Sequence, residues 1–289
     1  MEKNREEGML YLCATPIGNL DDITYRVLET LKKVDLIGAE DTRHSIKLLN
    51  HFAIRTPMTS YHEYNKVEKA KYLVEQMRQG KQVALITDAG TPGISDPGEE
   101  LVRQCIEANI RVTSLPGPAA CITALTMSGL ATKRFAFEAF LPPDKKERAA
   151  VLEELKRETR TIILYEAPHH LKKTLEELAG ALGAERKIAL CRELTKRYEE
   201  ARQSTLGELC ENLTPEEIRG EYVLVIEGKS LVQVRKEEQE KWEDMSIEEH
   251  MAYYENQGIA RKEAMKLVGR DRGISKRDVY QCLLKGNKS

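Results

Sequence analysis

Short apolar runs rich in β-branched residues alternate with helical periodicities along residues 9–230. Runs of this length and composition predict strands, and the apolar positions between them recur at intervals typical of amphipathic helices. A regular alternation of strands and helices favours an α/β fold with a largely parallel sheet covered by helices. The expected strands are residues 10–14, 35–39, 83–87, 111–115, 134–140, 161–165, 187–191 and 222–226.

One proline-rich stretch interrupts this alternation. The sequence "FLPPDKKER", residues 140–148, contains consecutive prolines, which break both helices and central strands. We therefore expect a hinge in this stretch. The pattern as a whole predicts two α/β domains, residues 9–130 and 131–230, followed by a helical tail over residues 240–289.

The distribution of charge marks the tail as a separate segment. Residues 231–256 carry three basic and eight acidic side chains, whereas residues 257–289 carry nine basic and three acidic ones. The net charge of the whole chain is only −2, so the protein as a whole has no general attraction to nucleic acid. A nucleic-acid partner would have to bind local basic patches.

The tail also has the signals of short helices. Ser246 with Glu249, and Ser275 with Asp278, have the spacing of capping boxes, and apolar residues follow each pair at helical intervals. Gly273 lies between the last two expected helices. These features predict a compact unit similar to a helix-turn-helix, with a basic face. The alternative is a solvated helical tail that only packs on the rest of the chain.

Composition narrows the class of protein. The chain has 289 residues, of which 41% are hydrophobic, so it can bury extensive cores. No apolar run approaches the ~20 residues of a membrane span, and the first residues are charged, so we expect a cytoplasmic protein without a membrane partner. The six cysteines are far apart and form no Cys-x-x-Cys pair. They predict buried thiols rather than a zinc site or a disulfide framework.

Three loops rich in glycine and proline each follow an expected strand and precede a helix. They are the first loop, "TPIGNLDD" (residues 15–22), the second loop, "DAGTPGISDPG" (residues 88–98), and the third loop, "PGPAA" (residues 116–120). In an α/β sheet, such loops lie at the carboxyl ends of the strands, where ligands bind. Together the three loops predict a binding pocket.

The composition of these loops restricts the ligand. A phosphate-binding loop combines backbone amides with a lysine, but the first and second loops contain no basic residue. The "GKS" at residues 228–230 lacks the first glycine of that motif and is interpreted as a turn. The dinucleotide pattern G-x-G-x-x-G is absent after the first strand. With Asp88 as a charged acceptor, the loops favour a cationic or zwitterionic ligand.

A series of blocks between residues 11 and 228 resembles the ribosomal RNA small subunit methyltransferase I family. These blocks are "YLCATPIGNLDDIT", "GAEDTRH", "SYHEYN", "ALITDAGTPGISDPG", "SLPGPAACITAL", "FEAFLP", "LYEAPHHL", "CRELTKRYEE" and "GEYVLVIEG". The resemblance implies the tetrapyrrole-methylase fold, S-adenosylmethionine as cofactor in a cleft between the two α/β domains, and a homodimer. It also implies methyl transfer to the 2′-oxygen of a cytidine in the decoding region of 16S ribosomal RNA.

The same resemblance assigns cofactor contacts to both domains. For Cys121, Tyr165 and Tyr222, ordinary core packing is the alternative. The expected cofactor-binding residues are Ile17, Asp88, Ala89, Gly90, Thr91, Ile94, Ala120, Cys121, Tyr165, Leu194 and Tyr222.

Methylation of a ribose hydroxyl benefits from a base, because the hydroxyl is a poor nucleophile. Asp41 and His44 in "GAEDTRH" are the expected catalytic residues, with His62 and Asp88 as further candidates. Asp41 has an alternative role as the cap of a helix that begins near Thr42. His44 and His62 could instead be ordinary surface residues. No metal is expected, since the histidines lack acidic partners at ligand spacing.

The RNA contacts are expected from Arg43, from the basic stretches "PPDKKER" (residues 142–148) and "TKR" (residues 195–197), and from the tail. Arginines suit phosphate recognition, and the tail gathers several basic residues around one turn. Two other functions stay open at this point. The first is a tetrapyrrole-type methyltransferase that acts on small molecules, in which the basic tail would have no role. The second is a non-catalytic RNA-binding protein, in which the second loop would have no role. The expected RNA-binding residues are Arg43, Arg270, Arg272, Lys276 and Arg277.

Overall fold

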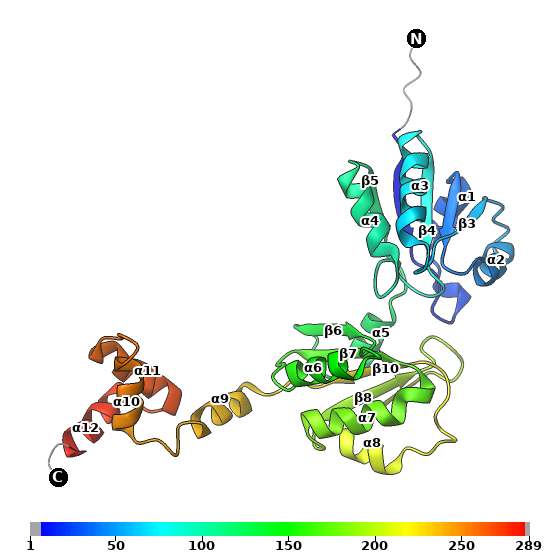
Figure 1. Ribbon diagram of the computed structural model, residues 1–289. Helices are drawn as coiled ribbons and strands as arrows, with labels where there is room; N and C mark the ends of the chain where they lie inside the picture. The colour runs from blue at the N-terminus through cyan, green and yellow to red at the C-terminus, as the bar shows by residue number, and fades with distance from the viewer. Residues whose placement is uncertain (1–6, 287–289) are drawn as a thin grey trace. The chain divides into compact units, whose positions relative to one another are not determined.

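The computed structural model describes residues 7–286, so residues 287–289 of the expected tail lie outside the described residues. The described chain divides into two compact units, which we consider separately (Figure 1). The body comprises the chain up to Glu153 together with Thr161–Glu227. The helical unit comprises Glu154–Arg160 and the chain from Gly228 onward.

The first half of the body is built on a five-stranded parallel sheet with the order β3-β2-β4-β1-β5. The apolar runs at residues 10–14, 35–39 and 83–87 lie in the buried centre of the sheet, whereas residues 111–115 form an edge strand with one buried residue. Residues 58–60 were not predicted, because a strand of three half-buried residues, Met-Thr-Ser, has no apolar run. The strands are β1 (Met9–Cys13), β2 (Leu36–Ala39), β3 (Met58–Ser60), β4 (Gln82–Ile86) and β5 (Arg111–Leu115).

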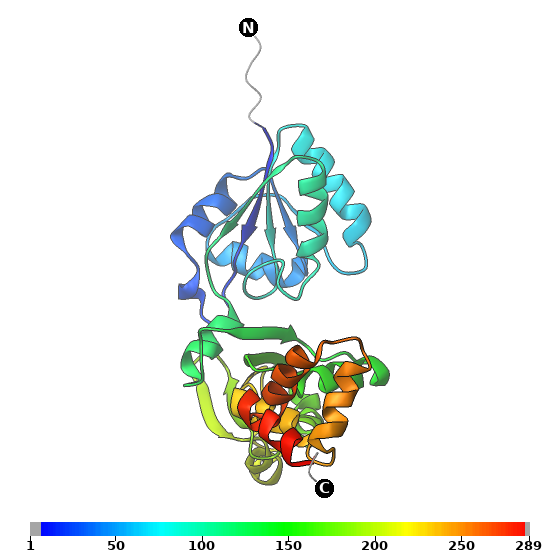
Figure 2. The ribbon, with the colours of Figure 1, turned by 90° about the vertical axis from the view of Figure 1, so that its left-hand side faces the viewer.

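Helices cover both faces of this sheet (Figure 2). Val27 and Leu31 of α1 and Leu49 of α2 pack on one face, while Leu73 of α3 and Leu101 of α4 pack on the other. This arrangement places the three Gly/Pro-rich loops at one edge of the sheet. The helices are α1 (Tyr25–Lys33), α2 (Thr42–His51), α3 (Lys66–Arg78) and α4 (Gly98–Glu107), with a short 3₁₀ helix, η1 (Leu20–Asp22), in the first loop.

The second half of the body contains a mixed sheet with the order β6-β7-β10-β8-β9. Only β6 and β7 are parallel, and the other neighbours are antiparallel. The expectation of a largely parallel sheet is therefore wrong for this half. A short loop without a helix joins β8 to β9, and such a connection pairs strands only in antiparallel fashion. The strands are β6 (Phe135–Ala139), β7 (Thr161–Glu166), β8 (Lys187–Arg192), β9 (Glu200–Thr205) and β10 (Tyr222–Ile226).

Four helices complete the second half. Cys121 and Leu125 of α5 pack against Ile163 and Val225 of the sheet, and α7 buries a row of leucines. Residues 140–144 join β6 to α6, and residues 145–148 form the start of α6, so the stretch lies inside this half and the hinge expected there is wrong. The prolines end a strand at the edge of the sheet and precede a helix, where they cost little. The helices are α5 (Ala120–Met127), α6 (Lys145–Leu155), α7 (Pro168–Leu182) and α8 (Leu206–Asn212).

The helical unit contains α9 (Leu231–Glu240), α10 (Ile247–Glu255), α11 (Arg261–Arg272) and α12 (Lys276–Gly286). The predicted capping boxes before α10 and α12 are confirmed by reciprocal hydrogen bonds. Gly273 ends α11 in the left-handed region, with φ 65°, as its position between two helices predicted. The first of these helices begins ahead of the expected tail boundary at residue 240. A small core joins the last three helices, made by Met251, Ala264, Val268, Val279 and Leu283.

The cysteines are free and mostly buried. Burial is confirmed for Cys13, Cys105, Cys121 and Cys191, but Cys282 is exposed on α12, where the expectation was wrong. No group of three His, Cys, Asp or Glu side chains between residues 7 and 286 is placed to hold a metal ion. None of the helices described is long and apolar enough to cross a membrane.

Candidate functional site

The three Gly/Pro-rich loops meet at the carboxyl edge of the first sheet. Thr15 and Gly90 exchange two backbone hydrogen bonds, N–H to carbonyl, of 2.9 and 3.0 Å, which join the first loop to the second. The Thr91 hydroxyl donates to the Pro118 carbonyl at 2.9 Å and joins the second loop to the third. The three loops therefore lie together, as the sequence predicted, and binding of a ligand by them stays a prediction.

Two glycines are required for this close approach. Gly90 has φ +86°, and a Cβ on it would lie 3.3 Å from Ile17 Cγ2. Gly117 in the third loop allows an even closer contact, since a Cβ there would lie 2.6 Å from the Cβ of Ala14. A side chain at Gly117 would push the chain segments apart, because carbon atoms do not approach to 2.6 Å, whereas at Gly90 it is the positive φ that disfavours a side chain.

The second loop is organised around the carboxylate of Asp96. This side chain accepts hydrogen bonds from the backbone amides of Gly93 and Gly98, each at 2.8 Å, and from Ile94 at 3.2 Å. Burial raises the pKa of Asp96 despite these three donors. The neighbouring Ser95 adopts φ 66°, a conformation that the surrounding hydrogen bonds must maintain.

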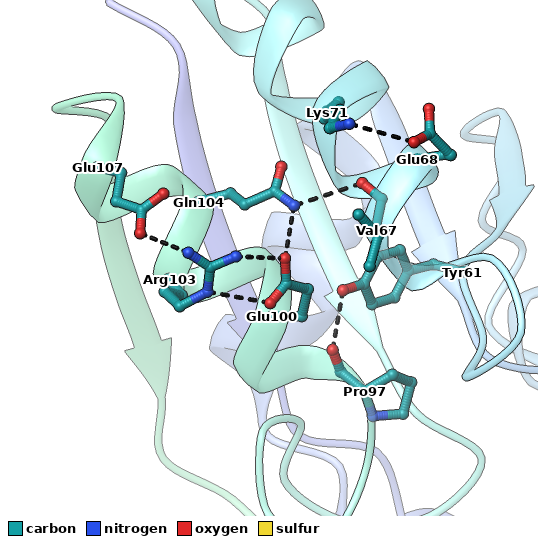
Figure 3. A network of polar contacts seen from close by, with 9 residues as sticks. All are labelled: Tyr61, Val67, Glu68, Lys71, Pro97, Glu100, Arg103, Gln104 and Glu107. Carbon is teal, nitrogen blue, oxygen red and sulfur yellow. Dashed lines mark hydrogen bonds and ion pairs between the residues drawn. The ribbon is translucent and has the colours of Figure 1, made fainter.

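A buried tyrosine anchors the end of the second loop. Tyr61, which follows β3, donates its hydroxyl hydrogen to the Pro97 carbonyl at 2.8 Å (Figure 3). In the same figure, Gln104 of α4 reaches the Val67 carbonyl of α3 at 3.3 Å. The ion pairs of Arg103 nearby lie on the surface and contribute little to the stability of the fold. The second loop is thus anchored to the scaffold near its carboxyl end, at Pro97.

A cavity of about 320 Å³ opens beside these loops, within the body. Its volume lies within the roughly 300–1,000 Å³ of sites for small ligands. All the expected cofactor-binding residues except Asp88 line it. The lining residues are Ile17, Glu40, Thr87, Ala89, Gly90, Thr91, Ile94, Ser95, Asp96, Ala119, Ala120, Cys121, Phe140, Tyr165, Glu166, Glu193, Leu194, Lys196, Glu221, Tyr222 and Val223.

The second sheet closes the cavity with side chains. The Tyr165 hydroxyl accepts a hydrogen bond of 3.1 Å from the backbone amide of Cys121, at the start of α5, and its ring packs edge-on against Phe137 and Phe140. Burial raises the pKa of Tyr165, which keeps the phenol neutral. Tyr222 also lines the cavity, but its hydroxyl bonds the Glu217 carbonyl of its own half.

Acidic side chains gather at the ends of β2 and β4. Glu40 lines the cavity and accepts a hydrogen bond of 2.6 Å from the Thr87 hydroxyl. Asp88 lies beside it without lining the cavity, and its Oδ1 accepts from the Asp41 amide at 3.2 Å. Desolvation raises the pKa of Asp88, and the nearby Glu40 adds to this effect. Sequence reasoning missed Glu40, although it directly follows β2 and the strand-end rule pointed to it.

The expected catalytic residues lie next to this cluster but do not line the cavity. The Asp41 carboxylate caps α2 and accepts from the Arg43 amide and guanidinium at 2.8 and 3.1 Å, which confirms the capping role. These bonds from Arg43 hold the pKa of Asp41 well below its usual range. His44 is exposed on α2, and His62 follows β3. Whether Asp41 or His44 takes part in catalysis stays a prediction.

The charge and polarity of the lining fit a cationic ligand. Apolar walls come from Ile17, Leu194 and Val223. Glu166 is buried and held by the Thr174 hydroxyl at 2.5 Å, and Glu193 and Glu221 also line the cavity. Lys196 is the only basic side chain among the lining residues that the structure describes. The donors and charges present therefore suit S-adenosylmethionine, whose sulfur carries a positive charge.

In the helical unit, one of the expected RNA-binding residues has a structural role. Arg272 donates through Nε to His250 Nδ1 at 3.1 Å and through Nη2 to the carbonyls of Ser246, at 3.1 Å, and Met245. These bonds attach the end of α11 to the start of α10. The guanidinium is therefore committed to the fold of the unit, which its place in a basic run could not reveal.

The other basic residues of this turn are more accessible. Arg270 is exposed and contacts Asp271 at 3.3 Å, Arg277 is exposed at the start of α12, and Lys276 is half-buried. Arg43 is exposed on α2, paired with Asp41. Binding of RNA by these residues stays a prediction.

Comparisons with known proteins agree with this geometry. The family model "Tetrapyrrole (Corrin/Porphyrin) Methylases" matches residues 9–210. Solved structures with the same fold include a diphthine synthase, with a TM-score of 0.60 and 12% identity over 76% of this chain and 90% of that one. A uroporphyrin-III C-methyltransferase from Thermus thermophilus, complexed with S-adenosyl homocysteine, has a TM-score of 0.55 and 19% identity over 78% of this chain and 100% of that one. Identities this low show the fold alone.

Curated relatives are far more similar. The chain is 47% identical to "Ribosomal RNA small subunit methyltransferase I" of Halalkalibacterium halodurans over 281 residues, 96% of each chain. It is 47% identical to the protein of that name from Bacillus subtilis, over 95% of this chain and 94% of the other. The protein of that name from Haemophilus influenzae is 54% identical over 77% of this chain and 79% of the other. The chain therefore belongs to the tetrapyrrole methylases and, within them, to the ribosomal RNA small subunit methyltransferase I family.

Proposed function

We propose that this protein transfers a methyl group from S-adenosylmethionine to the 2′-oxygen of a cytidine ribose in small-subunit ribosomal RNA. The observation that carries the proposal is the acid-rich cavity, whose lining includes nearly every position that the family resemblance assigned to the cofactor. Membership of the methyltransferase family supports the reaction class. The cytidine and its 2′-oxygen come from the family resemblance alone.

Bound S-adenosylmethionine supplies an electrophilic methyl group on a positively charged sulfur. The residues around the cavity would orient it and exclude water. Ile17 and Leu194 provide apolar surface, the backbone of the second loop provides hydrogen bonds, and Tyr165 fixes the start of α5. Because the sulfur loses its charge as the methyl group leaves, a strong anion in contact with it would favour the ground state. An apolar wall on that side suits the reaction better.

The acceptor hydroxyl must lose its proton, and Glu40 is the side chain that the geometry favours as the base. It lines the cavity, and among residues 7–286 its carboxylate is held through one oxygen only, by the Thr87 hydroxyl. The second oxygen is free to accept the proton from the ribose 2′-oxygen. Asp41, by contrast, is held by Arg43, which makes it a weaker base. General base catalysis of this kind contributes typically ~10²–10⁴ in rate.

Transfer of labelled methyl groups to purified 30S subunits tests this function. The subunits would come from cells that lack this protein, with protein-free 16S ribosomal RNA as a parallel substrate, and the products would be digested to nucleosides. We expect label in 2′-O-methylcytidine. Measurable binding of S-adenosylmethionine without any label in the RNA would contradict the proposal and favour a small-molecule acceptor.

We further propose that the active form is a cytoplasmic homodimer, as the family resemblance implies. Sedimentation of the purified protein should then give a single species of twice the 32.9 kDa chain mass. A monomer that methylates 30S subunits at full rate would contradict the dimer and leave the reaction intact.

A further inference from the structure

The loop between β8 and β9, which we call the 193–199 loop, carries Lys196, the cavity's single cation among the residues described. The ammonium group lies 3.0 Å from the Glu193 carboxylate, and 42% of its side chain is exposed. A cationic cofactor gains nothing from a lysine near its sulfur. The position of Lys196, half in the cavity and half in solvent, instead suits an anionic group at the entrance.

The backbone of this loop is held in a strained conformation. Glu193 and Thr195 have φ values of 50° and 65°, although neither is a glycine. The Thr195 amide donates to Glu199 at 2.6 Å, and its hydroxyl accepts from the Asn19 amide of the first loop at 3.1 Å. Such strain persists where the surroundings enforce it, commonly at functional sites. The loop is thus positioned rigidly beside the first loop.

The next two residues extend the positive charge away from the cavity and add an aromatic surface. The Arg197 guanidinium lies 5.5 Å from the centre of the Tyr198 ring and forms no ion pair within residues 7–286. Tyr198 is 71% exposed. Exposed aromatic rings next to arginines and lysines are a common way to bind unpaired nucleotides, through base stacking and phosphate contacts.

We propose that the 193–199 loop binds the acceptor RNA strand at the cavity entrance. Lys196 and Arg197 contact phosphates that flank the acceptor nucleotide, and Tyr198 stacks on an unpaired neighbouring base. This inference rests on the proposed function, in which RNA is the acceptor. A role for Lys196 in holding the cofactor's carboxylate would not explain why the cation and the aromatic ring continue outside the cavity.

Steady-state methylation of 30S subunits at several salt concentrations tests the proposal, together with calorimetric binding of S-adenosylmethionine. We expect Lys196→Ala and Tyr198→Ala each to raise KM for 30S subunits by about tenfold, and Arg197→Ala by several-fold, as loss of one stacked base or phosphate contact implies. The slope of log(kcat/KM) against log(salt) should become shallower by about 0.7 for each lysine or arginine removed. Lys196→Arg should retain most of the affinity, because it keeps the charge.

Matched variants exist on the first half of the body. Lys32 pairs with Glu29 three residues earlier, and 45% of its side chain is exposed, much as in Lys196. Tyr72 is 45% exposed and has the Lys69 ammonium over its ring. Lys32 lies at the end of α1, toward the amino edge of the sheet, and Tyr72 lies on α3. Lys32→Ala and Tyr72→Ala should leave KM and its salt dependence unchanged.

The outcomes separate this inference from the function on which it rests. If the wild-type protein binds S-adenosylmethionine but does not methylate 30S subunits, the proposed function fails and the RNA-binding loop fails with it. If the wild type methylates them while all three alanine variants keep their KM and salt slope, only the loop proposal is overturned. Equal weakening of cofactor binding and of KM in Lys196→Ala, with Arg197→Ala and Tyr198→Ala unaffected, would also overturn it.

Discussion

The two halves of the body contribute to the cavity in different ways. The first half has an all-parallel sheet, and its carboxyl edge supplies three loops whose backbones are hydrogen-bonded to one another. The second half has a mostly antiparallel sheet and supplies side chains, chiefly Tyr165, Leu194 and Tyr222. The comparison indicates that the shape of the cavity wall depends on glycines and backbone amides in the first half, and on individual side chains in the second half.

The charges are divided in the same uneven manner. The acids nearest the expected reaction, Glu40 and Asp88, follow strands of the first half. Lys196, the only cation among the described lining residues, comes from the second half. If the first half carries the chemistry and the second half encloses the ligands, substitutions in the two halves should affect different steps. The predictions below test this division, in order of decreasing effect.

The largest effect is expected for Glu40→Gln, which removes the proposed base with little change in shape. The kcat for methylation of 30S subunits should fall by about 10²–10⁴. Binding of S-adenosylmethionine, measured by calorimetry, should weaken far less, since the amide can still accept the hydrogen bond from Thr87. A kcat within threefold of wild type would remove Glu40 from the reaction and return attention to Asp88.

Gly117→Val tests the dependence of the first half on backbone shape. Its Cβ would clash with Ala14 at 2.6 Å, so the first and third loops must separate. Overpacking of this kind costs about 1–3 kcal/mol, and cofactor affinity should fall at least tenfold. Gly180→Ala on α7 is the matched control: nothing lies within 4 Å of its Cβ, and the helix should gain about 0.5–1 kcal/mol. Unchanged cofactor binding in Gly117→Val would show that the loops tolerate separation.

Tyr165→Phe tests the second half's use of side chains. The variant keeps the ring but leaves the Cys121 amide without its acceptor, at a cost of about 1–3 kcal/mol if no water replaces it. Cofactor affinity should fall by several-fold, with kcat nearly unchanged. Tyr222→Phe is the comparison, because its hydroxyl bonds Glu217 and not the third loop. It should lower stability more than cofactor affinity, and the opposite ranking of the two variants would contradict this assignment.

The sequence was most informative where a signal is local. Apolar runs located most strands of both sheets, and glycine and proline marked all three loops, because turns and buried strands depend on short stretches of chain. Strand pairing in the second sheet depends on tertiary packing, so its antiparallel arrangement was not predictable. The short β3 and the polar β9, Glu200–Thr205, have no apolar run to reveal them.

Site residues divide in a similar way. Loop positions such as Gly90 and Thr91 were assigned from the family resemblance, and both line the cavity. The direction of a side chain at a strand end cannot be read from composition, so Glu40 was missed and its neighbour Asp41 was preferred. Arg272 has the composition of a surface cation, yet its partners, His250 and two carbonyls, come from another helix. Only the folded structure shows which of two neighbouring acids lines the cavity and which arginine is bonded within the fold.

The smallest effect is expected for Asp41→Asn, which sharpens the contrast with Glu40. Asparagine caps helices about as well as aspartate, so the variant removes mainly the charge paired with Arg43. The rate of methylation of 30S subunits should stay within about threefold of wild type, whereas loss of a general base would lower it far more.

The same variant should change the pH dependence of stability. Because Arg43 lowers the folded-state pKa of Asp41, the charge of Asp41 stabilises the protein above the unfolded pKa near 4 and loses this effect as pH falls toward the lower folded value. Urea midpoints should therefore favour the wild type slightly at pH 7 and converge below pH ~4. A large loss of kcat with unchanged midpoints would instead make Asp41 the base.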